Sequence, residues 1–95
     1  MKYKTVEELE IRFPKIPYHM LISLVAYRDN GRYVGGFLEA LLSNDLMKAL
    51  ARADDNNIMA LADYGKILYN DMPSDSWGSP EQYKAWLKQN GLKGV

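Results

Sequence analysis

Residues that begin or end helices divide this chain into short segments, and no other feature of the sequence limits the fold more. Such residues (proline, glycine, serine, asparagine and aspartate) recur at positions 14, 17, 30–31, 35–36, 44–45, 54–57, 73, 79–80 and 90–91. Between these breaks, apolar residues recur at the spacing of a helix. The pattern predicts an all-α fold, a compact bundle of four to six short helices.

Length and composition limit the chain further. Its 95 residues are enough for one domain with a single core. The absence of cysteine excludes a disulfide framework, a thiolate nucleophile and a cysteine-based zinc or iron–sulfur centre. The 12 Lys and Arg balance 12 Asp and Glu, and a net charge of zero argues against bulk electrostatic binding of nucleic acid. We expect one helical domain over residues 1–95, with residues 1–13 as an N-terminal extension.

The first part of the chain carries the signals of two segments. Thr5 and Glu8 form a capping-box pattern, but the residues that follow alternate between apolar and polar. Residues 5–13 therefore form either a short helical turn or a short edge strand. Pro17 is placed to be the first helical residue of the next segment, which Asn30-Gly31 ends. The stripe expected to be buried in that helix comprises Leu21, Leu24, Val25 and Arg28.

The middle of the chain predicts two or three more helices. Gly35-Gly36 opens the first, and residues 37–53 form either one bent helix or two short ones. The polar cluster at residues 54–57 can cap a helix over about residues 56–70. Gly65 inside that helix predicts a close approach by another helix or an aromatic ring. The side chains expected to turn inward are Leu46, Met47 and Leu50, and then Ile58, Leu61, Ala62, Gly65 and Leu68.

The last helix has the clearest start in the sequence. Ser79 is expected at its N-cap and Pro80 at its first position, with Gln82 as the third residue of a capping box. Gly91 is expected at the C′ position, just beyond the end of the helix. The apolar stripe of this helix comprises Tyr83, Trp86 and Leu87.

Few side chains offer catalytic or metal-binding chemistry. His19 is the only histidine, and no nucleophile or orienting partner stands near it in the sequence. We interpret it as a surface or cap-proximal residue. The aspartates at positions 45, 54, 55 and 63 lack the EF-hand spacing, and Asp54 and Asp55 are more simply explained as helix caps. We predict no catalytic residue, no metal site and no cofactor.

The candidate binding residues are basic or aromatic. Arg28, Arg32 and Tyr33 form a cluster that either binds an anion, since arginine holds phosphate and tyrosine stacks on a base, or is a solvated turn. Arg52 is expected to pair with the aspartates that follow it. Trp77 stands in a loop rich in Pro, Gly, Ser and Asp. It either anchors this loop on the core or belongs to a binding surface, and its ring can also form one wall of a pocket.

Three motifs resemble a family of small uncharacterised proteins of tailed bacteriophages and prophages. They are G-G-F-L-x-A-x-L-x-N-D-L at residues 35–46, R-A-D-x-x-N at residues 52–57 and P-x-x-x-W-G-S-P-E at residues 73–81. The resemblance covers roughly residues 14–90 and carries no known reaction. It implies a phage accessory protein that acts in the host cytoplasm, with no membrane segment.

The resemblance also sets the functional expectation. It implies a non-catalytic protein that counters host defence by sequestering a small anionic, nucleotide-like signalling ligand or by binding a host protein. The exposed aromatic residues favour a homo-oligomer. The alternative is a small regulatory or nucleic-acid-binding helical domain, for which Lys84 and Lys88 on the last helix are the only candidates. An enzyme ranks third. The residues predicted to bind the ligand are Arg28, Arg32, Tyr33, Arg52, Tyr69, Trp77 and Ser79.

Overall fold

The computed structural model describes residues 3–94, which form helices and turns without a strand, so the predicted all-α fold is confirmed. The elements are α1 (Val6–Arg12), α2 (Tyr18–Asn30), α3 (Gly36–Leu42), α4 (Leu46–Arg52), α5 (Asp55–Met59), α6 (Leu61–Asp71), the 3-10 turn η1 (Ser74–Ser76), α7 (Pro80–Lys88) and the 3-10 turn η2 (Gly91–Gly94). The expected domain of residues 1–95 includes Met1, Lys2 and Val95, which lie outside the described residues. Within residues 3–94, no helix combines the length and the apolar character that a bilayer span requires.

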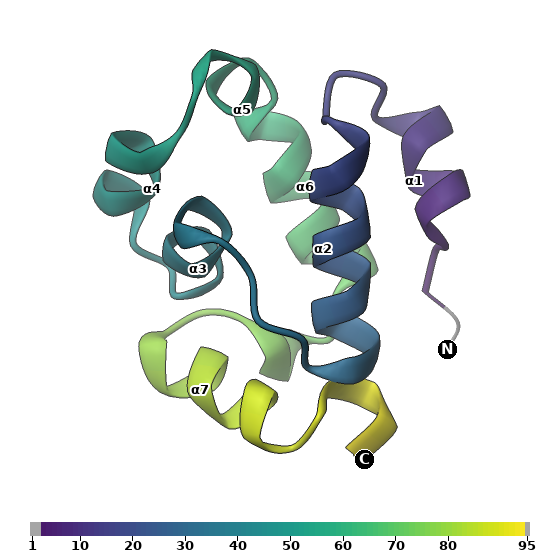
Figure 1. Ribbon diagram of the computed structural model, residues 1–95, viewed down its shortest axis with the longest axis vertical. Helices are drawn as coiled ribbons and strands as arrows, with labels where there is room; N and C mark the ends of the chain where they lie inside the picture. Colours follow the sequence, from purple (N-terminus) through teal and green to yellow (C-terminus); the bar gives the residue numbers. More distant parts are fainter. Residues whose placement is uncertain (1–2, 95) are drawn as a thin grey trace.

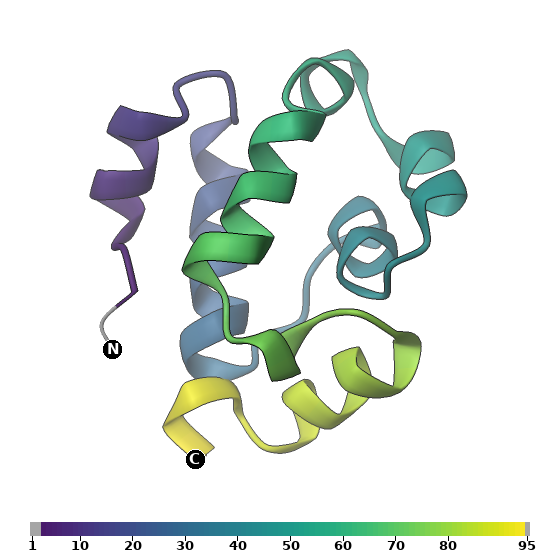
Figure 2. The same cartoon turned by 180° about the vertical axis from the view of Figure 1, so that it is seen from behind.

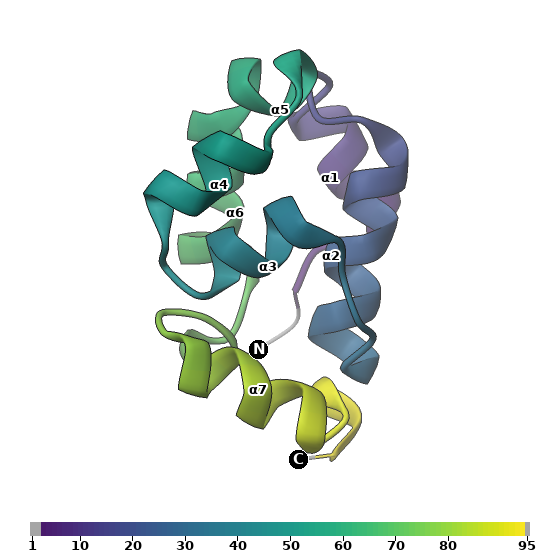
Figure 3. The same cartoon turned by 60° about the vertical axis from the view of Figure 1, so that its left-hand side comes forward.

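Helix α2 forms the axis of the molecule (Figure 1). Helix α1 packs along one side of it, and α6 runs behind it, as the opposite view shows (Figure 2). Helices α3 and α4 pack on each other away from α1, and α7 crosses one end of the molecule (Figure 3). The turn η2 packs on α2. Buried apolar side chains from α1, α2, α3, α6 and α7 meet in one core.

The N-terminal segment is a helix, which decides between the two alternatives for residues 5–13. The Thr5 hydroxyl accepts a hydrogen bond from the Glu8 N–H (3.2 Å), and the Glu8 carboxylate accepts one from the Thr5 N–H (2.9 Å). The predicted capping box is therefore formed. Leu9 and Phe13 are buried in the core, so the segment expected as an extension is packed into the fold.

Helix α2 begins one residue later than expected. Pro17 is its N-cap and Tyr18 its first residue, so the prediction that Pro17 is helical is wrong. The extended backbone of Pro17 (ψ 139°) joins the preceding loop to the helix, while its carbonyl accepts a hydrogen bond from the Leu21 N–H (3.3 Å). The helix ends at Gly31 in the left-handed conformation, as expected. Of the predicted stripe, the buried members are Leu21, Leu24 and Arg28, whereas Val25 is half-buried.

Residues 37–53 form two helices and not one bent helix. Asn44 lies between the two helices, and its left-handed conformation (φ 60°) interrupts the helical backbone. The Asp45 carboxylate then caps α4 by accepting a hydrogen bond from the Lys48 N–H (3.1 Å). The aspartate at position 45, one of the residues expected to begin or end a helix, therefore does cap the second of the two helices.

Helix α4 exposes side chains that were expected to be buried. Leu46 is 54% exposed and Met47 is 74% exposed, so the prediction that they turn inward is wrong. Helix α4 has only seven residues and packs on α3. Its buried side is occupied by Ala49, with Leu50 half-buried beside it, so Leu46 and Met47 are left outside.

The helix expected over residues 56–70 is divided at Ala60 into α5 and α6. This division brings the described α-helices to seven, against the four to six expected. The Asp54 carboxylate accepts a hydrogen bond from the Asn57 N–H (2.8 Å), so the predicted cap is present. Because the break changes the helical phase, Ile58 and Ala62 are exposed. The buried face of α6 comprises Tyr64, Ile67, Leu68 and Asp71.

Gly65 does not receive the close approach that was expected. A Cβ atom built on it meets nothing within 4 Å apart from its own helix. It lies instead at the edge of an open groove between α6 and the α3–α4 turn. The space beside Gly65 is therefore a surface feature.

Tyr27 ties α2 to the C-terminal third of the chain. Its hydroxyl donates a hydrogen bond to the Ser76 carbonyl (2.6 Å), and its carbonyl accepts one from the Trp86 indole N–H (3.0 Å). Its ring stacks on Tyr83 with 5.6 Å between centroids. The predicted stripe of α7 is therefore confirmed for Tyr83 and Trp86, which are buried. These contacts hold α7 across the end of α2.

Candidate functional site

Two left-handed turns position the linker between α2 and α3. Gly31 (φ +67°) ends α2, and Asn90 and Gly91 (both φ +65°) follow α7. The C-cap of α7 is Gln89, so Asn90 holds the C′ position that was expected for Gly91. A Cβ atom on Gly31 would lie 2.7 Å from the Asn90 Cα, and one on Gly91 would lie 2.6 Å from the Gly31 nitrogen. Because side chains are excluded here, the two backbones pack directly on each other. This contact brings Arg32 and Lys93 to the lining of the same hollow.

Arg32 and Lys93 line an open hollow of about 460 Å³. The other lining residues are polar or small, namely Asn30, Asn90 and Gly94. Within residues 3–94, neither cation forms an ion pair. Among residues 3–94, the hollow therefore presents two positive charges without a paired acid.

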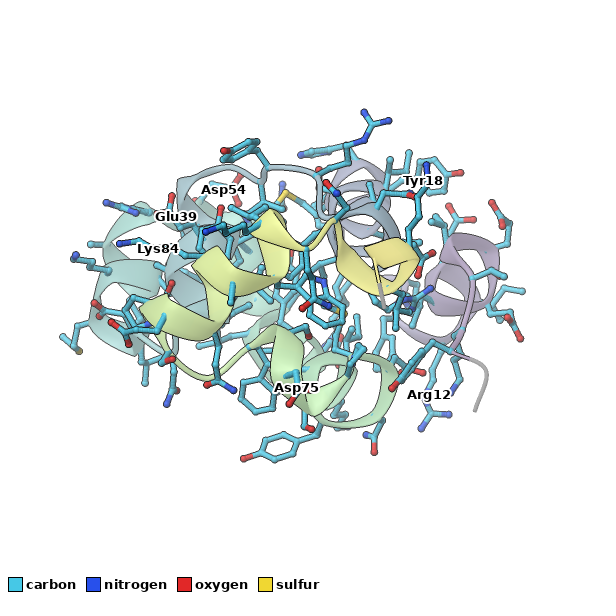
Figure 4. The ribbon with its side chains drawn as sticks, turned by 90° about the horizontal axis from the view of Figure 1, so that it is seen from below. Arg12, Tyr18, Glu39, Asp54, Asp75 and Lys84 are labelled. Atoms are coloured by element: carbon cyan, nitrogen blue, oxygen red, sulfur yellow. The ribbon has the colours of Figure 1, made fainter. Side chains whose placement is uncertain are left out.

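A second hollow of about 470 Å³ lies between the same linker and α7. Tyr33 forms one side and is 84% exposed, while Lys84 and Lys88, one turn apart on α7, form another. Neither lysine is ion-paired within the described part of the chain. Glu39 is the single acid in this lining, and Figure 4 shows it beside Lys84 at the edge of α7. We call Arg32, Tyr33, Lys84, Lys88 and Lys93 the basic face.

The floor of the second hollow is apolar. Tyr83 and Leu87 form part of its lining. The pKa of the Tyr83 hydroxyl is raised, first by burial and then by the nearby carboxylate of Glu39, and the Val34 backbone N–H opposes this by hydrogen bonding. A neutral tyrosine beneath exposed lysines leaves the positive charge of the basic face intact.

Arg28 does not belong to the basic face, although the sequence grouped it with Arg32. Its Nη1 donates to the Asp71 carbonyl (3.2 Å) and its Nε donates to the Asp29 carboxylate (2.8 Å). Its guanidinium also lies over the Tyr3 ring, 5.5 Å from the centroid. Arg28 is only 3% exposed, so the structure places it in the interior between α2 and α6.

Tyr69 and Trp77 come together at a different place. Their rings meet edge to face with 5.0 Å between centroids, and Tyr69 is 79% exposed. Trp77 is partly buried and packs against the core, so it anchors its loop and also lines the groove beside Gly65. Trp77 is therefore the expected anchor of its loop, and its ring also forms one wall of a pocket, as the sequence allowed.

The remaining predicted site residues have structural partners. Arg52 donates from Nη1 to the Gly36 carbonyl (3.3 Å) and forms no ion pair among the described residues, so the expected pairing with the neighbouring aspartates is not found. The Ser79 hydroxyl accepts a hydrogen bond from the Gln82 N–H (3.1 Å) and caps α7, as predicted. The expected capping box is not completed, because the Gln82 side chain donates to the Ser74 carbonyl (3.4 Å). The structure thus divides the predicted residues among several places: Tyr69 and Trp77 meet in a ring contact, whereas Arg32 and Tyr33, neighbours in the linker, line different hollows.

One group of polar side chains was not anticipated as a group. His19, Ser23 and Asp54 line a third hollow, of about 350 Å³, although α2 and α5 are distant in the sequence. The Asp54 carboxylate caps α5 here. In residues 3–94 no hydrogen bond joins these three side chains, so they do not form the connected chain of a catalytic triad. Only the spacing of His19 and Ser23, one helical turn apart, hinted at this grouping.

Lys93 was also missed, because its place in the same hollow as Arg32 depends on the packing of Gly31 against Asn90 and Gly91, which are distant in the sequence. Within residues 3–94, no three His, Cys, Asp or Glu side chains gather closely enough to hold a metal ion. Comparisons of the chain with family models, with curated proteins and with solved structures find no match.

Proposed function

We propose that this chain is a non-catalytic binding protein that holds a small anionic, nucleotide-like ligand on its basic face. One observation carries the proposal. Arg32 and Lys93 line one hollow, and Lys84 and Lys88 line a second with the highly exposed Tyr33; none of the four cations is ion-paired within residues 3–94, in a chain whose net charge is zero. Charge is therefore concentrated at this face.

The chemistry of the basic face suits a phosphate joined to a planar base. The guanidinium of Arg32 can donate two parallel hydrogen bonds to a phosphate, and Lys93 can add a point charge in the same hollow. The exposed ring of Tyr33 offers a stacking surface for a base. Lys84 and Lys88 can hold a second phosphate across the adjacent hollow.

The resemblance to phage accessory proteins narrows the proposed ligand. It places the ligand among the nucleotide signals of host defence, in the host cytoplasm, where a phage protein would sequester it. Sequestration requires binding alone. The proposed function therefore needs no catalytic group at the basic face.

Isothermal titration against cyclic dinucleotides, cyclic trinucleotides and ADP-ribose tests the proposal. We expect one class to bind, and the double variant Arg32→Ala/Lys93→Ala to bind at least about tenfold more weakly, since about 1.4 kcal/mol is a factor of ten. The matched control is Arg12→Ala/Lys15→Ala, which removes one arginine and one lysine from an exposed region outside the basic face. Absence of both heat and a thermal shift across the whole panel contradicts the proposal.

A second candidate function is nucleic-acid binding. The observation that favours it is the position of Lys84 and Lys88, both exposed on one side of α7. Binding driven by phosphates must weaken steeply as salt increases. Mobility-shift assays at low and moderate salt distinguish this function, because a nucleotide-binding protein will not retard duplex or single-stranded nucleic acid at moderate salt.

A further inference from the structure

Two Asn-Gly pairs occur in this chain, Asn30-Gly31 and Asn90-Gly91. Both asparagines are exposed, and both line the hollow that contains Arg32. An asparagine before a glycine is prone to deamidation, because the glycine has no side chain to hinder attack of its backbone nitrogen on the asparagine side chain. The proposed function gives neither asparagine a role.

The two pairs differ in what holds the glycine nitrogen. The Gly31 N–H donates a hydrogen bond to the Tyr27 carbonyl (2.9 Å), and Asn30 is the last residue of α2. Asn90 lies beyond the end of α7, and within residues 3–94 the Gly91 N–H donates no hydrogen bond. The nitrogen that attacks in deamidation is therefore occupied in the first pair and available in the second.

We propose that Asn90 is a site of spontaneous deamidation. The Gly91 nitrogen attacks Cγ of the Asn90 side chain and forms a new carbon–nitrogen bond. The side-chain amide nitrogen leaves as ammonia and takes the proton of the Gly91 N–H. One water molecule then breaks one of the two carbonyl–nitrogen bonds of the resulting succinimide, which gives aspartate or isoaspartate at position 90. No oxidant, reductant or cofactor takes part.

The fold can hold the aspartate product without strain. Asn90 is in the left-handed conformation (φ 65°), which aspartate tolerates as asparagine does. Isoaspartate instead adds one carbon to the backbone at a tight contact, where a Cβ atom on Gly31 would lie 2.7 Å from the Asn90 Cα. The isoaspartate product should therefore also loosen the packing of η2 on α2.

The position of the new charge gives the reaction a consequence. Asn90 lines the same hollow as Arg32 and Lys93, so deamidation adds a carboxylate to a place where two cations have no ion-pair partner in the described residues. This carboxylate repels an anionic ligand and attracts the cations that would hold it. The effect on binding rests on the proposed function, whereas the reaction itself does not.

Peptide mass spectrometry of the unaltered protein, incubated folded at mildly alkaline pH, tests the reaction. We expect the mass change from amide to acid to accumulate at least about fivefold faster at Asn90 than at Asn30, because a hydrogen bond holds only the Gly31 nitrogen. In urea the two pairs should react at similar rates, which is the control that assigns the difference to the fold. A folded chain in which Asn90 reacts no faster than Asn30, or in which neither reacts, overturns the proposal.

The variant Asn90→Asp supplies the product for titration against cyclic dinucleotides, cyclic trinucleotides and ADP-ribose. It should bind at least about tenfold more weakly than the unaltered chain. Asn56→Asp makes the same change at an exposed position outside the basic face and should bind normally, and circular dichroism establishes that both variants are folded. Unchanged binding by Asn90→Asp overturns the effect of the new charge. A panel that gives no heat with the unaltered chain contradicts the proposed function alone, and the mass spectra still decide whether Asn90 reacts.

Discussion

Arg28 and Arg32 stand one helical turn apart in the sequence, and their surroundings give them opposite roles. Arg28 is 3% exposed and donates to the Asp71 carbonyl and to the carboxylate of its neighbour Asp29, whereas Arg32 is exposed and unpaired within the described chain. A buried arginine is held by its acceptors, and these acceptors lose their partner when it is removed. Substitution of Arg28 should therefore lower the stability of the protein, whereas substitution of Arg32 should affect ligand binding and leave stability almost unchanged.

We expect Arg28→Met to lower the free energy of unfolding by about 2 kcal/mol, because a buried charge-assisted hydrogen bond is lost. Arg32→Ala should change it by less than about 0.5 kcal/mol, as for an exposed side chain without partners. Urea denaturation of both variants measures these values. Equal losses of stability in the two variants would show that Arg28 is not a structural residue.

Two glycines make a similar contrast. Gly65 lies inside α6 with free space around its Cα, so Gly65→Ala should stabilise the protein by about 1 kcal/mol through helix propensity. Gly31 has a φ of +67° and no room for a Cβ beside Asn90, so Gly31→Ala should destabilise it. Thermal melting of the two variants checks both signs. A lower melting temperature for Gly65→Ala would indicate that the groove is tighter than the structure shows.

At the scale of elements, the short helices depend on their caps. Ser79 caps α7 through the Gln82 N–H and precedes Pro80. We expect Ser79→Ala to cost about 1 kcal/mol, and Ser79→Asp to retain most of the stability because aspartate is an equally good cap. Chemical denaturation measures both, with the exposed Ser74→Ala as the control. If the aspartate variant loses as much as the alanine variant, the hydroxyl has a role other than capping.

The caps are also the part of the fold that the sequence predicts best, for a physical reason. A cap is a hydrogen bond between residues three apart, so Thr5, Asp45, Asp54 and Ser79 are all found where their patterns indicate. The break at Ala60 has no such signature, since alanine favours a helix. Because the sequence does not indicate this break, one continuous helix was expected, and Ile58 and Ala62 were wrongly assigned to its buried face.

The candidate site shows the same division between local and distant causes. Arg32 and Tyr33 could be predicted because the turn after Gly31 is visible in the sequence. Lys93 could not, because it reaches Arg32 through the packing of Gly31 against Gly91 across the length of the chain. The helical stripe of α2 includes Arg28, but the acceptor that holds its guanidinium, the Asp71 carbonyl in α6, is not visible in the sequence near Arg28.

At the scale of the whole molecule, buried tyrosines connect the parts of the core. Tyr27 joins α2 to η1 and α7, and the Tyr64 hydroxyl joins α6 to α5 by donating to the Asn57 side chain (2.7 Å). Burial is the largest cause that raises the pKa of Tyr27, Tyr64 and Tyr83. All three pKa values are raised, so deprotonation of each tyrosine changes the stability of the fold in the same direction.

These raised pKa values predict that the protein loses stability in alkali. Below a pH of about 10 the three phenols are protonated in both states, and their contribution to stability is fully present. Above it, the unfolded chain releases phenolic protons that the folded chain keeps, so the free energy of unfolding falls by about 1.4 kcal/mol per pH unit for each tyrosine. Denaturation at increasing pH measures this slope. Tyr64→Phe removes one titrating group and should make the fall shallower. If Tyr64→Phe leaves the slope unchanged, the Tyr64 hydroxyl does not contribute to the loss of stability in alkali, and the prediction for this residue is wrong.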